Sequence, residues 1–463
     1  MPSPESFDAE RPSGEVPPIP HEDSRTPYQH DRDRLLYSSA FRRLAGVTQV
    51  AAVREYRLLH NRLTHSLKVA QIARRTAERL VRIEGFQSDL EPDSAASLPD
   101  IAETAGLAHD IGHPPFGHIA ESVLDRRMKP LGGFEGNAQS FRIVTKLAVR
   151  RRTTSGLDLT RASLNGILKY PRFREQVPPK TVSSRLPFTD RSRGSKWGVY
   201  GSERQEFIHA RKQFEGTWPD EARSVAAILM DWADDISFAT HDIDDYFKAG
   251  LIPLQDLRLP RDQDAFFTYS KTKLCGGFDS FPEGFDWDSY QREFERILPS
   301  IPLRKYTDSR YDRLGLVNFV TRQIAELARA LHPAPSPRFI DIDGWALHRA
   351  EVLKQIHWFY VIDRPPLLVA QKGQEAIIGN LFDILIELLQ GGMDKIPVTL
   401  REIYLSIILD EAQTRWWASE DEKCGRAVCD YLCSLTEDQA VDLYERLTGF
   451  SISRGSIFGT WFH

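Results

Sequence analysis

The amino-acid sequence predicts a mainly α-helical fold. Apolar residues recur at steps of three and four along several long segments, and the strongest pattern covers six turns over 221–247. No alternation of apolar and polar residues is long enough for a large sheet, and no internal repeat is present. At about 150 residues per domain, 463 residues correspond to roughly three domains or to one large helical domain.

Helical patterns follow one another along most of the chain. Their periodicity predicts helices over 62–83, 221–247, 315–331, 345–361, 374–390 and 420–447. It also predicts a short helix that ends at 108–110 and another that begins at about 118.

Proline, glycine and composition place the breaks between these helices. Residues 1–25 contain six prolines and little apolar periodicity, so we expect a mobile tail. The segment GHPPFG at 112–117 cannot continue a helix, because its two prolines lack backbone donors and restrict their neighbours. Residues 150–201 are basic and irregular, which predicts short elements and loops over a cleft.

Composition and charge exclude several classes of protein. Hydrophobic residues at 41% and charged residues at 27% match average globular chains rather than collagen-like, coiled-coil or disordered ones. A net charge of -5 does not provide the overall positive field expected of a dedicated binder of nucleic acid or membrane surfaces. The sequence has no membrane-spanning run, no secretion signal and only four cysteines, so we expect a cytoplasmic protein without membrane contact.

Four positions suggest a metal site. His65 lies on the inward stripe of its helix, and His109 and Asp110 end a helix shortly before Gly112. Adjacent side chains leave a helix about 100° apart, so both can reach one ion only near a helix end. With an acid from 221–247, two imidazoles and two carboxylates suit a divalent ion such as Mg, Mn, Fe or Co.

Six segments of the chain together resemble a known family. They are SSAFRRLAGVTQV, NRLTHSLKVA, GLAHDIGHPPFGHIAE, FEGNAQSFRIV, KWGVYGSE and ADDISFATHDIDD. Their order over about residues 28–250 is similar to that of the successive motifs of the HD-domain deoxynucleoside triphosphate triphosphohydrolases, the dGTPase family. A weaker similarity extends to the end of the chain.

This resemblance implies an all-α HD-domain fold, one large domain with a helical C-terminal extension. It implies a catalytic core over 26–250, and a region over 251–463 that completes the cleft and supplies oligomer contacts. The implied reaction is metal-dependent hydrolysis of a dNTP, such as dGTP, to a deoxynucleoside and inorganic triphosphate.

The resemblance also implies the metal ligands, which are His65, His109, Asp110 and Asp234. Helical periodicity favours Asp235 instead, since 100° per residue sets it about 60° from the apolar stripe, against about 160° for Asp234. We follow the family pattern, in which the ligand precedes an aromatic residue by four positions and a second Asp by eight.

The segment after the proline loop resembles the catalytic part of the family. His118 and Glu121 lie at i and i+3 on one helix face, where the carboxylate can orient the imidazole. The resemblance implies that they are the catalytic pair, with His113 as a further catalytic donor beside them. The sequence leaves open which of the two is the acid, and whether His118 activates the water instead.

The remaining substrate contacts also follow from the resemblance. Three phosphates carry about four negative charges, and the motifs place Arg62, Lys196 and His113 as the cationic or donor groups that counter them.

The sugar is expected to contact Gln49 and Asp242 through its 3′-hydroxyl. Val50 is expected to pack beside the sugar and exclude a 2′-hydroxyl. Phe238 stands where many members have Tyr, and Gly136 stands where many have His. These two departures leave the reaction class intact and bear on rate and substrate preference.

Two other functions fit the same residues. An HD-domain phosphodiesterase or pyrophosphohydrolase acting on another nucleotide would use the same metal set. A catalytically inactive nucleotide sensor would need no proton-transfer groups. The family resemblance implies a homo-oligomer, often a hexamer, with an activating nucleotide or single-stranded DNA as further partners. The sequence leaves open the preferred base, the native metal, and a role in dNTP housekeeping or antiviral defence.

Overall fold

The computed structural model of the chain is mainly helical. It describes residues 6–14, 23–49, 60–83, 85–151, 154–177, 196–275, 281–282, 284–362, 365–410, 416–417 and 419–449. Within these ranges the only sheet pairs β1 (Leu331–Pro333) with β2 (Ile340–Ile342). The predicted all-α fold class is therefore confirmed.

The helices fall into two halves of the chain. Those of the first half are α1 (Pro27–Leu36), α2 (Ser39–Arg43), α3 (Arg62–Leu80), α4 (Pro92–Ala95), α5 (Leu98–Ala108), α6 (Gly117–Met128), α7 (Gly136–Arg142), α8 (Arg161–Ile167), α10 (Arg204–Arg211) and α11 (Val225–Lys248). Those of the second half are α12 (Pro260–Cys275), α13 (Trp287–Ile297), α14 (Arg310–Arg329), α15 (Gly344–His357), α16 (Pro365–Gly391), α17 (Val398–Leu409), α19 (Glu420–Leu432) and α20 (Glu437–Thr448).

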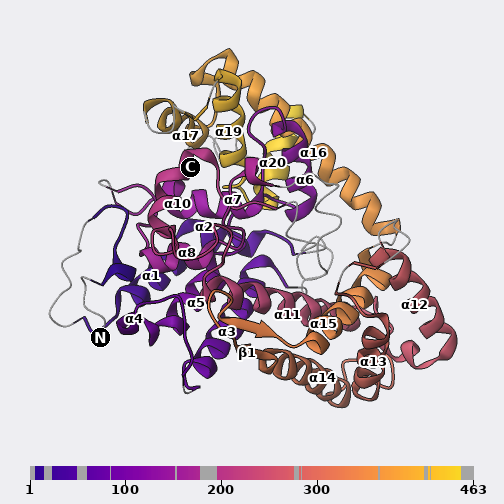
Figure 1. The fold of residues 1–463 in the computed structure, drawn as a ribbon. Helices are drawn as coiled ribbons and strands as arrows, with labels where there is room; N and C mark the ends of the chain where they lie inside the picture. Colours follow the sequence, from indigo (N-terminus) through magenta and orange to yellow (C-terminus); the bar gives the residue numbers. More distant parts are fainter. Residues whose placement is uncertain are drawn as a thin grey trace.

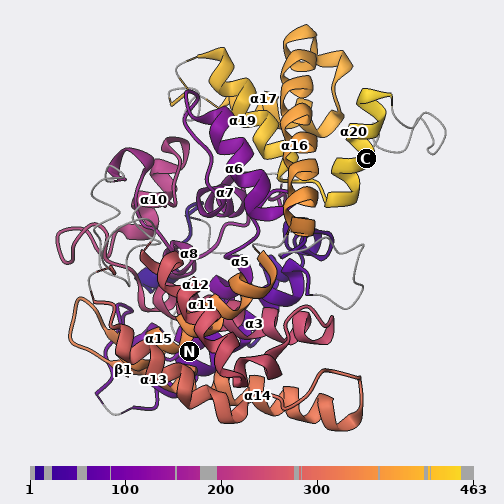
Figure 2. The same cartoon turned by 90° about the vertical axis from the view of Figure 1, so that its right-hand side faces the viewer.

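The helices form two tiers, which both views of the ribbon separate (Figures 1 and 2). In the lower tier α3, α5 and α11 share one apolar core with α12 to α15. In the upper tier α6 shares a second core with α16, α17, α19 and α20. Each tier thus combines helices from both halves of the chain, and α5 and α6, which follow one another in sequence, lie in different tiers.

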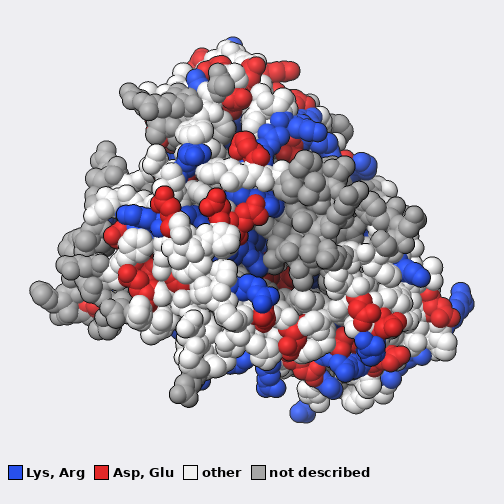
Figure 3. All heavy atoms as spheres, viewed as in Figure 1, with Lys and Arg blue, Asp and Glu red and all other residues white. Residues whose placement is uncertain are grey.

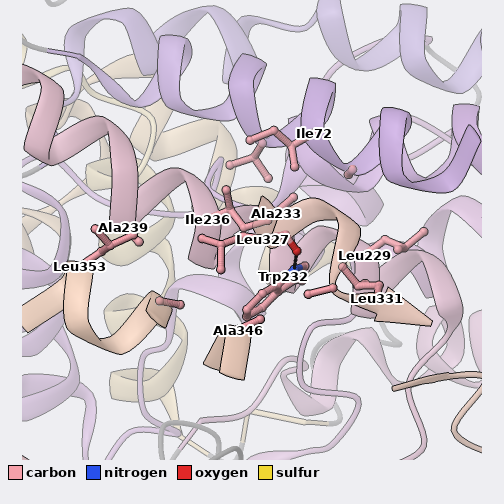
Figure 4. Close-up of a cluster of buried hydrophobic side chains, with 14 of the residues drawn as sticks. Ile72, Leu229, Trp232, Ala233, Ile236, Ala239, Leu327, Leu331, Ala346 and Leu353 are labelled. Atoms are coloured by element: carbon pink, nitrogen blue, oxygen red, sulfur yellow. Dashed lines mark hydrogen bonds between the residues drawn. The ribbon is translucent and has the colours of Figure 1, made fainter. Parts of the chain in front are cut away.

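Helix α11 is the central element of the lower tier, as its six-turn apolar pattern predicts. It begins after Ser224, whose side chain accepts the backbone N–H of Ala227. Trp232 is buried on the side facing α14 and donates its indole N–H to the carbonyl of Leu327 at 3.0 Å (Figure 4). Burying each such large apolar side chain stabilises the fold by about 1.5–3 kcal/mol.

Two helical regions differ most from those that periodicity predicts. The pattern over 420–447 is two helices, because Thr436 and Gln439 form a capping box that starts α20 after a short turn. Helix α16 begins at Pro365, well before the predicted 374–390, since Pro is tolerated in the first turn of a helix.

Part of the expected N-terminal tail is packed rather than mobile. Arg11 is buried and forms an ion pair of 2.7 Å with buried Asp31 of α1. Asp8 is also buried and accepts the backbone N–H of Glu91 at 2.7 Å. Residues 6–14 are therefore attached to the helical core by polar anchors, although the segment lacks apolar periodicity.

The surface carries both signs of charge. In Figure 3 Lys and Arg atoms are interspersed with Asp and Glu atoms over the face shown, in keeping with a net charge of -5. In the described part of the chain, no helix combines the length and the apolar character that crossing a bilayer requires.

Candidate active site

Three helices bring one cluster of imidazoles and carboxylates together in the lower tier. His65 comes from α3, His109 and Asp110 directly follow α5, and Asp234 comes from α11. One ligand atom each from His65, His109 and Asp110 lies within 4.8 Å of the others. Asp234 Oδ1 lies 3.0 Å from Nε2 of His65 and 3.6 Å from Nε2 of His109. The structure thus brings together all four residues for which the sequence suggests a metal role.

The hydrogen bonds of His109 fix its tautomer and leave a lone pair facing carboxylates. Its Nδ1 lies 2.7 Å from the carbonyl oxygen of Gly106, which can only accept, so Nδ1 carries the proton. Its buried Nε2 has no hydrogen-bond partner among the described residues. Carboxylate oxygens of Asp110 and Asp234 lie 3.5 and 3.6 Å from it. In the neutral imidazole this Nε2 keeps its lone pair, and a lone pair beside two carboxylates is the environment that a divalent cation fits.

Asp110 is held as an ionised carboxylate. One oxygen accepts Arg62 Nη1 at 2.6 Å, and the other lies 3.0 Å from Nδ1 of His113. Burial by itself raises the pKa of Asp110, but the neighbouring His109 imidazole and the charge of Arg62 outweigh it and hold that pKa well below its usual range. A ligand that is already ionised needs to lose no proton before it binds a cation.

Asp234 is paired with a lysine that the sequence analysis did not single out. Lys169 Nζ lies 2.7 Å from Asp234 Oδ2 and 3.0 Å from Asp231 Oδ1. Burial raises the pKa of Asp234, but Lys169 and His109 outweigh it and lower that pKa well below its usual value. The neighbouring Asp235 faces a different partner, Lys354 Nζ, at 2.7 Å.

A second cluster lies beside the first, at the start of α6. His118 Nδ1 lies 2.7 Å from Glu121 Oε2, and His113 Nε2 lies 3.7 Å from the same oxygen. Burial raises the pKa of Glu121, but Lys196 and His118 outweigh it, so that pKa is well below its usual range. An ionised carboxylate can only accept, so Nδ1 of His118 carries a proton and Nε2 can exchange one.

The other oxygen of Glu121 faces Lys196. Lys196 Nζ lies 2.7 Å from Glu121 Oε1 and 3.0 Å from Glu135 Oε1. Gly136 closes this cluster, since a Cβ atom there would lie 3.2 Å from Nε2 of His113. A larger residue at 136 would therefore require His113 to move.

Both clusters open into one cavity of about 420 Å³ between the two tiers. Its described lining residues are Gln49, Arg62, His109, Asp110, His113, Phe116, His118, Ile119, Asn137, Lys169, Tyr170, Lys196, Asp234, Asp235, Phe238, Lys354, Trp358, Ile362 and Gln371. A cavity of this size holds a molecule of nucleotide dimensions.

The residues expected at the sugar have different surroundings. Gln49 and Phe238 line the cavity, and Val50 lies outside the described residues. Asp242 is not among the lining residues; it is buried, with one carboxylate oxygen 3.1 Å from Nδ1 of His357. Burial and the charge of Asp245 raise the pKa of Asp242 well above its usual value.

Several residues that line the cavity were not predicted from the sequence. Lys169 and Tyr170 belong to an ILKYP segment whose irregular pattern predicts only a loop. Lys354 and Trp358 lie at the end of α15, where periodicity alone predicts a core helix. The sequence feature that could have indicated Lys169 and Tyr170 is a lysine next to a tyrosine within a basic loop.

The chain is similar to known proteins over most of its length. A family model described as HD domain matches residues 62–185, and one described as Phosphohydrolase-associated domain matches residues 345–446. A deoxyguanosinetriphosphate triphosphohydrolase-like protein of Corynebacterium diphtheriae is 31% identical over 95% of this chain and 95% of its own length. Proteins of the same description from Streptomyces coelicolor and Corynebacterium efficiens are 31% and 32% identical, over 92% and 93% of this chain and 93% of each relative. The chain therefore belongs to the family of the deoxyguanosinetriphosphate triphosphohydrolase-like proteins and contains an HD domain.

Proposed function

We propose that this protein hydrolyses deoxynucleoside triphosphates to a deoxynucleoside and inorganic triphosphate. Its family and its His and Asp cluster support the broader assignment of a metal-dependent nucleotide triphosphohydrolase. The observation that carries the proposal is the unpartnered Nε2 of His109 among the described residues, which faces two carboxylates on the wall of a nucleotide-sized cavity.

A divalent ion fits His65, His109, Asp110 and Asp234. When bound, such an ion would polarise a phosphoryl oxygen and lower the pKa of a water molecule.

Cationic side chains on the cavity wall suit a triphosphate. Lys169, Lys196 and Arg62 all line the cavity, and Nη2 of Arg62 is buried without a hydrogen-bond partner in the described part of the chain. Burial lowers the pKa of Lys169, but Asp234 and Asp231 outweigh it and raise that pKa well above its usual value. Lys169 therefore stays charged at neutral pH, and we assign it to the phosphates together with Arg62 and Lys196.

The proposed reaction forms a bond from a water oxygen to the α-phosphorus and breaks the bond from that phosphorus to the 5′-oxygen. The water loses a proton, and the 5′-oxygen of the departing deoxynucleoside gains one. We assign this proton exchange to His118 and Glu121, because Glu121 fixes the tautomer of His118 and leaves Nε2 free to exchange.

The residues assigned to the sugar differ in whether they line the cavity. Gln49 and Phe238 lie on the cavity wall, where an amide can bond a hydroxyl and a ring can pack against a sugar. Asp242 lies buried behind the cavity wall, beside His357. We therefore assign it an indirect role at the sugar, in which it orients the neighbouring side chains.

Product analysis tests the proposal. The purified protein is incubated with Mn²⁺ or Mg²⁺ and each of the four dNTPs, alone and mixed, with GTP for comparison with dGTP. We expect inorganic triphosphate and deoxynucleoside in equal amounts, slower turnover of GTP, and no turnover after chelation of the metal. The His109→Ala variant is expected to fold and to be inactive.

The other two functions predict different products. A pyrophosphohydrolase would release pyrophosphate, and a phosphodiesterase would leave dNTPs intact and cleave another nucleotide. A sensor would bind dNTPs without any product. Each of these results would contradict the proposal.

A further inference from the structure

One residue of the C-terminal region connects two separate segments of the site. Glu437 is the first residue of α20, a helix that lies beside α16 in the upper tier (Figures 1 and 2). Its side chain is buried, although a glutamate at the first position of a helix is ordinarily exposed to solvent. It reaches Thr48, which is 389 positions away in sequence, and Phe116, which is 321 positions away.

Both carboxylate oxygens of Glu437 accept hydrogen bonds. Oε1 accepts the backbone N–H of Thr48 at 2.8 Å and that of Phe116 at 3.2 Å. Oε2 accepts the Thr48 hydroxyl at 2.6 Å. Hydrogen bonds to an ionised acceptor are about twice as strong as neutral ones, so three of them on one buried carboxylate fix the spacing of the two segments.

The Thr48 segment carries the phosphate and sugar side of the site. The carbonyl of Thr48 accepts Nε of Arg62 at 3.1 Å, and Nη1 of Arg62 donates to Asp110. The next residue, Gln49, lines the cavity. A displacement of Thr48 would therefore move both the Arg62 side chain and Gln49.

The Phe116 segment carries the proton-transfer side. Phe116 lines the cavity and precedes α6 by one residue, with a φ of 67° in the left-handed region. Residues with a side chain rarely adopt this conformation, and it persists only where the surroundings hold it. Gly117 follows with a φ of 56°, and a Cβ atom there would lie 2.5 Å from Arg62 Nη2. His118 comes next, so its position depends on this strained turn.

A buried arginine reinforces the same junction. Arg43 donates from Nη1 to the carbonyl of Leu435 at 2.9 Å, and from Nη2 to those of Ile111 and His113 at 3.0 and 2.7 Å. The turn before α20 is thus attached to the loop that bears His113 as well.

We infer that Glu437 is a positioning residue, which sets the distance between the substrate-binding segment at Thr48 and Gln49 and the proton-transfer pair of α6. The C-terminal region thereby contributes to the rate of the reaction through a residue that does not line the cavity. The effect on rate rests on the proposed function, whereas the connection between the segments does not.

Three variants separate positioning from general stabilisation. Glu437→Ala removes all three bonds. Glu437→Gln keeps them, because an amide oxygen can accept both N–H groups while the amide NH₂ donates to the Thr48 hydroxyl. Asp442→Asn changes an exposed carboxylate on the same helix and is the control.

Three quantities are measured on each folded variant: amide protection, kcat and Mn²⁺ affinity. Hydrogen–deuterium exchange reports protection of the amides at Thr48 and Phe116 without any turnover. For Glu437→Ala we expect that protection to fall at least about tenfold and kcat to fall about 10- to 100-fold, with Mn²⁺ affinity within about threefold of wild type. Glu437→Gln and Asp442→Asn are expected to stay within about threefold of wild type in all three quantities.

The outcomes are distinct. Unchanged protection and kcat in Glu437→Ala would overturn the inference, as would parallel losses of kcat and metal affinity that follow the unfolded fraction. If Glu437→Ala does not fold, Thr48→Val removes only the hydroxyl bond and is expected to lower kcat about 3- to 10-fold. If the wild type turns over no dNTP, the proposed function fails, and the exchange measurement alone still decides whether Glu437 holds the two segments.

Discussion

Asp234 and Asp235 are adjacent in sequence, yet their carboxylates lie in different environments. Asp234 Oδ1 is 3.0 Å from Nε2 of His65, whereas Asp235 Oδ1 is 2.7 Å from Nζ of Lys354. The two residues therefore form a matched pair for testing the metal site.

We predict that Asp234→Asn lowers Mn²⁺ affinity at least about 10-fold and abolishes turnover, because it removes an anionic ligand atom beside two imidazoles. Asp235→Asn is expected to leave Mn²⁺ affinity within about threefold of wild type. Calorimetric titration of the two variants measures both. Equal losses of affinity in the two variants would contradict the assignment of Asp234.

The pair of His118 and Glu121 gives a prediction about rate. We expect His118→Ala to lower kcat about 10²- to 10⁴-fold, with nucleotide affinity nearly unchanged, because only proton transfer is removed. Since Glu121 acts through His118, the double variant with Glu121→Gln should be little slower than His118→Ala alone. Steady-state kinetics measure this, with exposed Arg126→Ala on the same helix as the control. Fully additive losses would mean that the two residues act independently.

A buried ion network joins α7 to the C-terminal region and gives a prediction about stability. Arg142 is fully buried between Glu203 at 2.6 Å and Asp430 at 2.8 Å. Arg142→Met would leave two buried carboxylates without their cation, so we expect the free energy of unfolding to fall by about 3–5 kcal/mol. Arg75→Met, at an ion pair whose arginine side chain is 68% exposed, should change it by less than about 1 kcal/mol. Denaturant unfolding of both variants makes the comparison, and similar small changes would refute the prediction.

Asp89 gives a pH-dependent prediction. It is buried and accepts the backbone N–H of Val225, the first residue of α11, and burial raises its pKa to about 6. The folded state therefore binds this proton more tightly than the unfolded state, and the stability contributed by the protonated form is lost as pH rises from about 4 through about 6.

Asp89→Asn keeps the acceptor and removes the charge. We expect it to raise the free energy of unfolding by up to about 3 kcal/mol near pH 8, and by much less near pH 4. Thermal unfolding at both pH values is the measurement, with exposed Asp442→Asn as the control. A gain at pH 4 equal to that at pH 8 would show that the charge is not the cause.

The helical elements follow from the sequence because helix formation is a local property. The apolar steps over 221–247 identify α11, and the position of His109 and Asp110 before the proline loop follows from backbone chemistry. Periodicity nevertheless favours Asp235 over Asp234. Periodicity measures the angle from the apolar stripe at Trp232, and that stripe packs toward α14. His65 on α3 instead approaches the side of α11 that bears Asp234.

The sequence by itself determined the helices, the family resemblance and the residue types that suit a cation and a phosphate chain, since these depend on neighbours in sequence. The tertiary structure alone decided that Lys169 pairs with Asp234, that Lys354 faces Asp235, and that Glu437 joins Thr48 to Phe116. The physical reason is that an ion pair or hydrogen bond depends on distances of a few ångströms. For residues up to 389 positions apart, those distances are set by how the two tiers pack and leave no pattern along the chain.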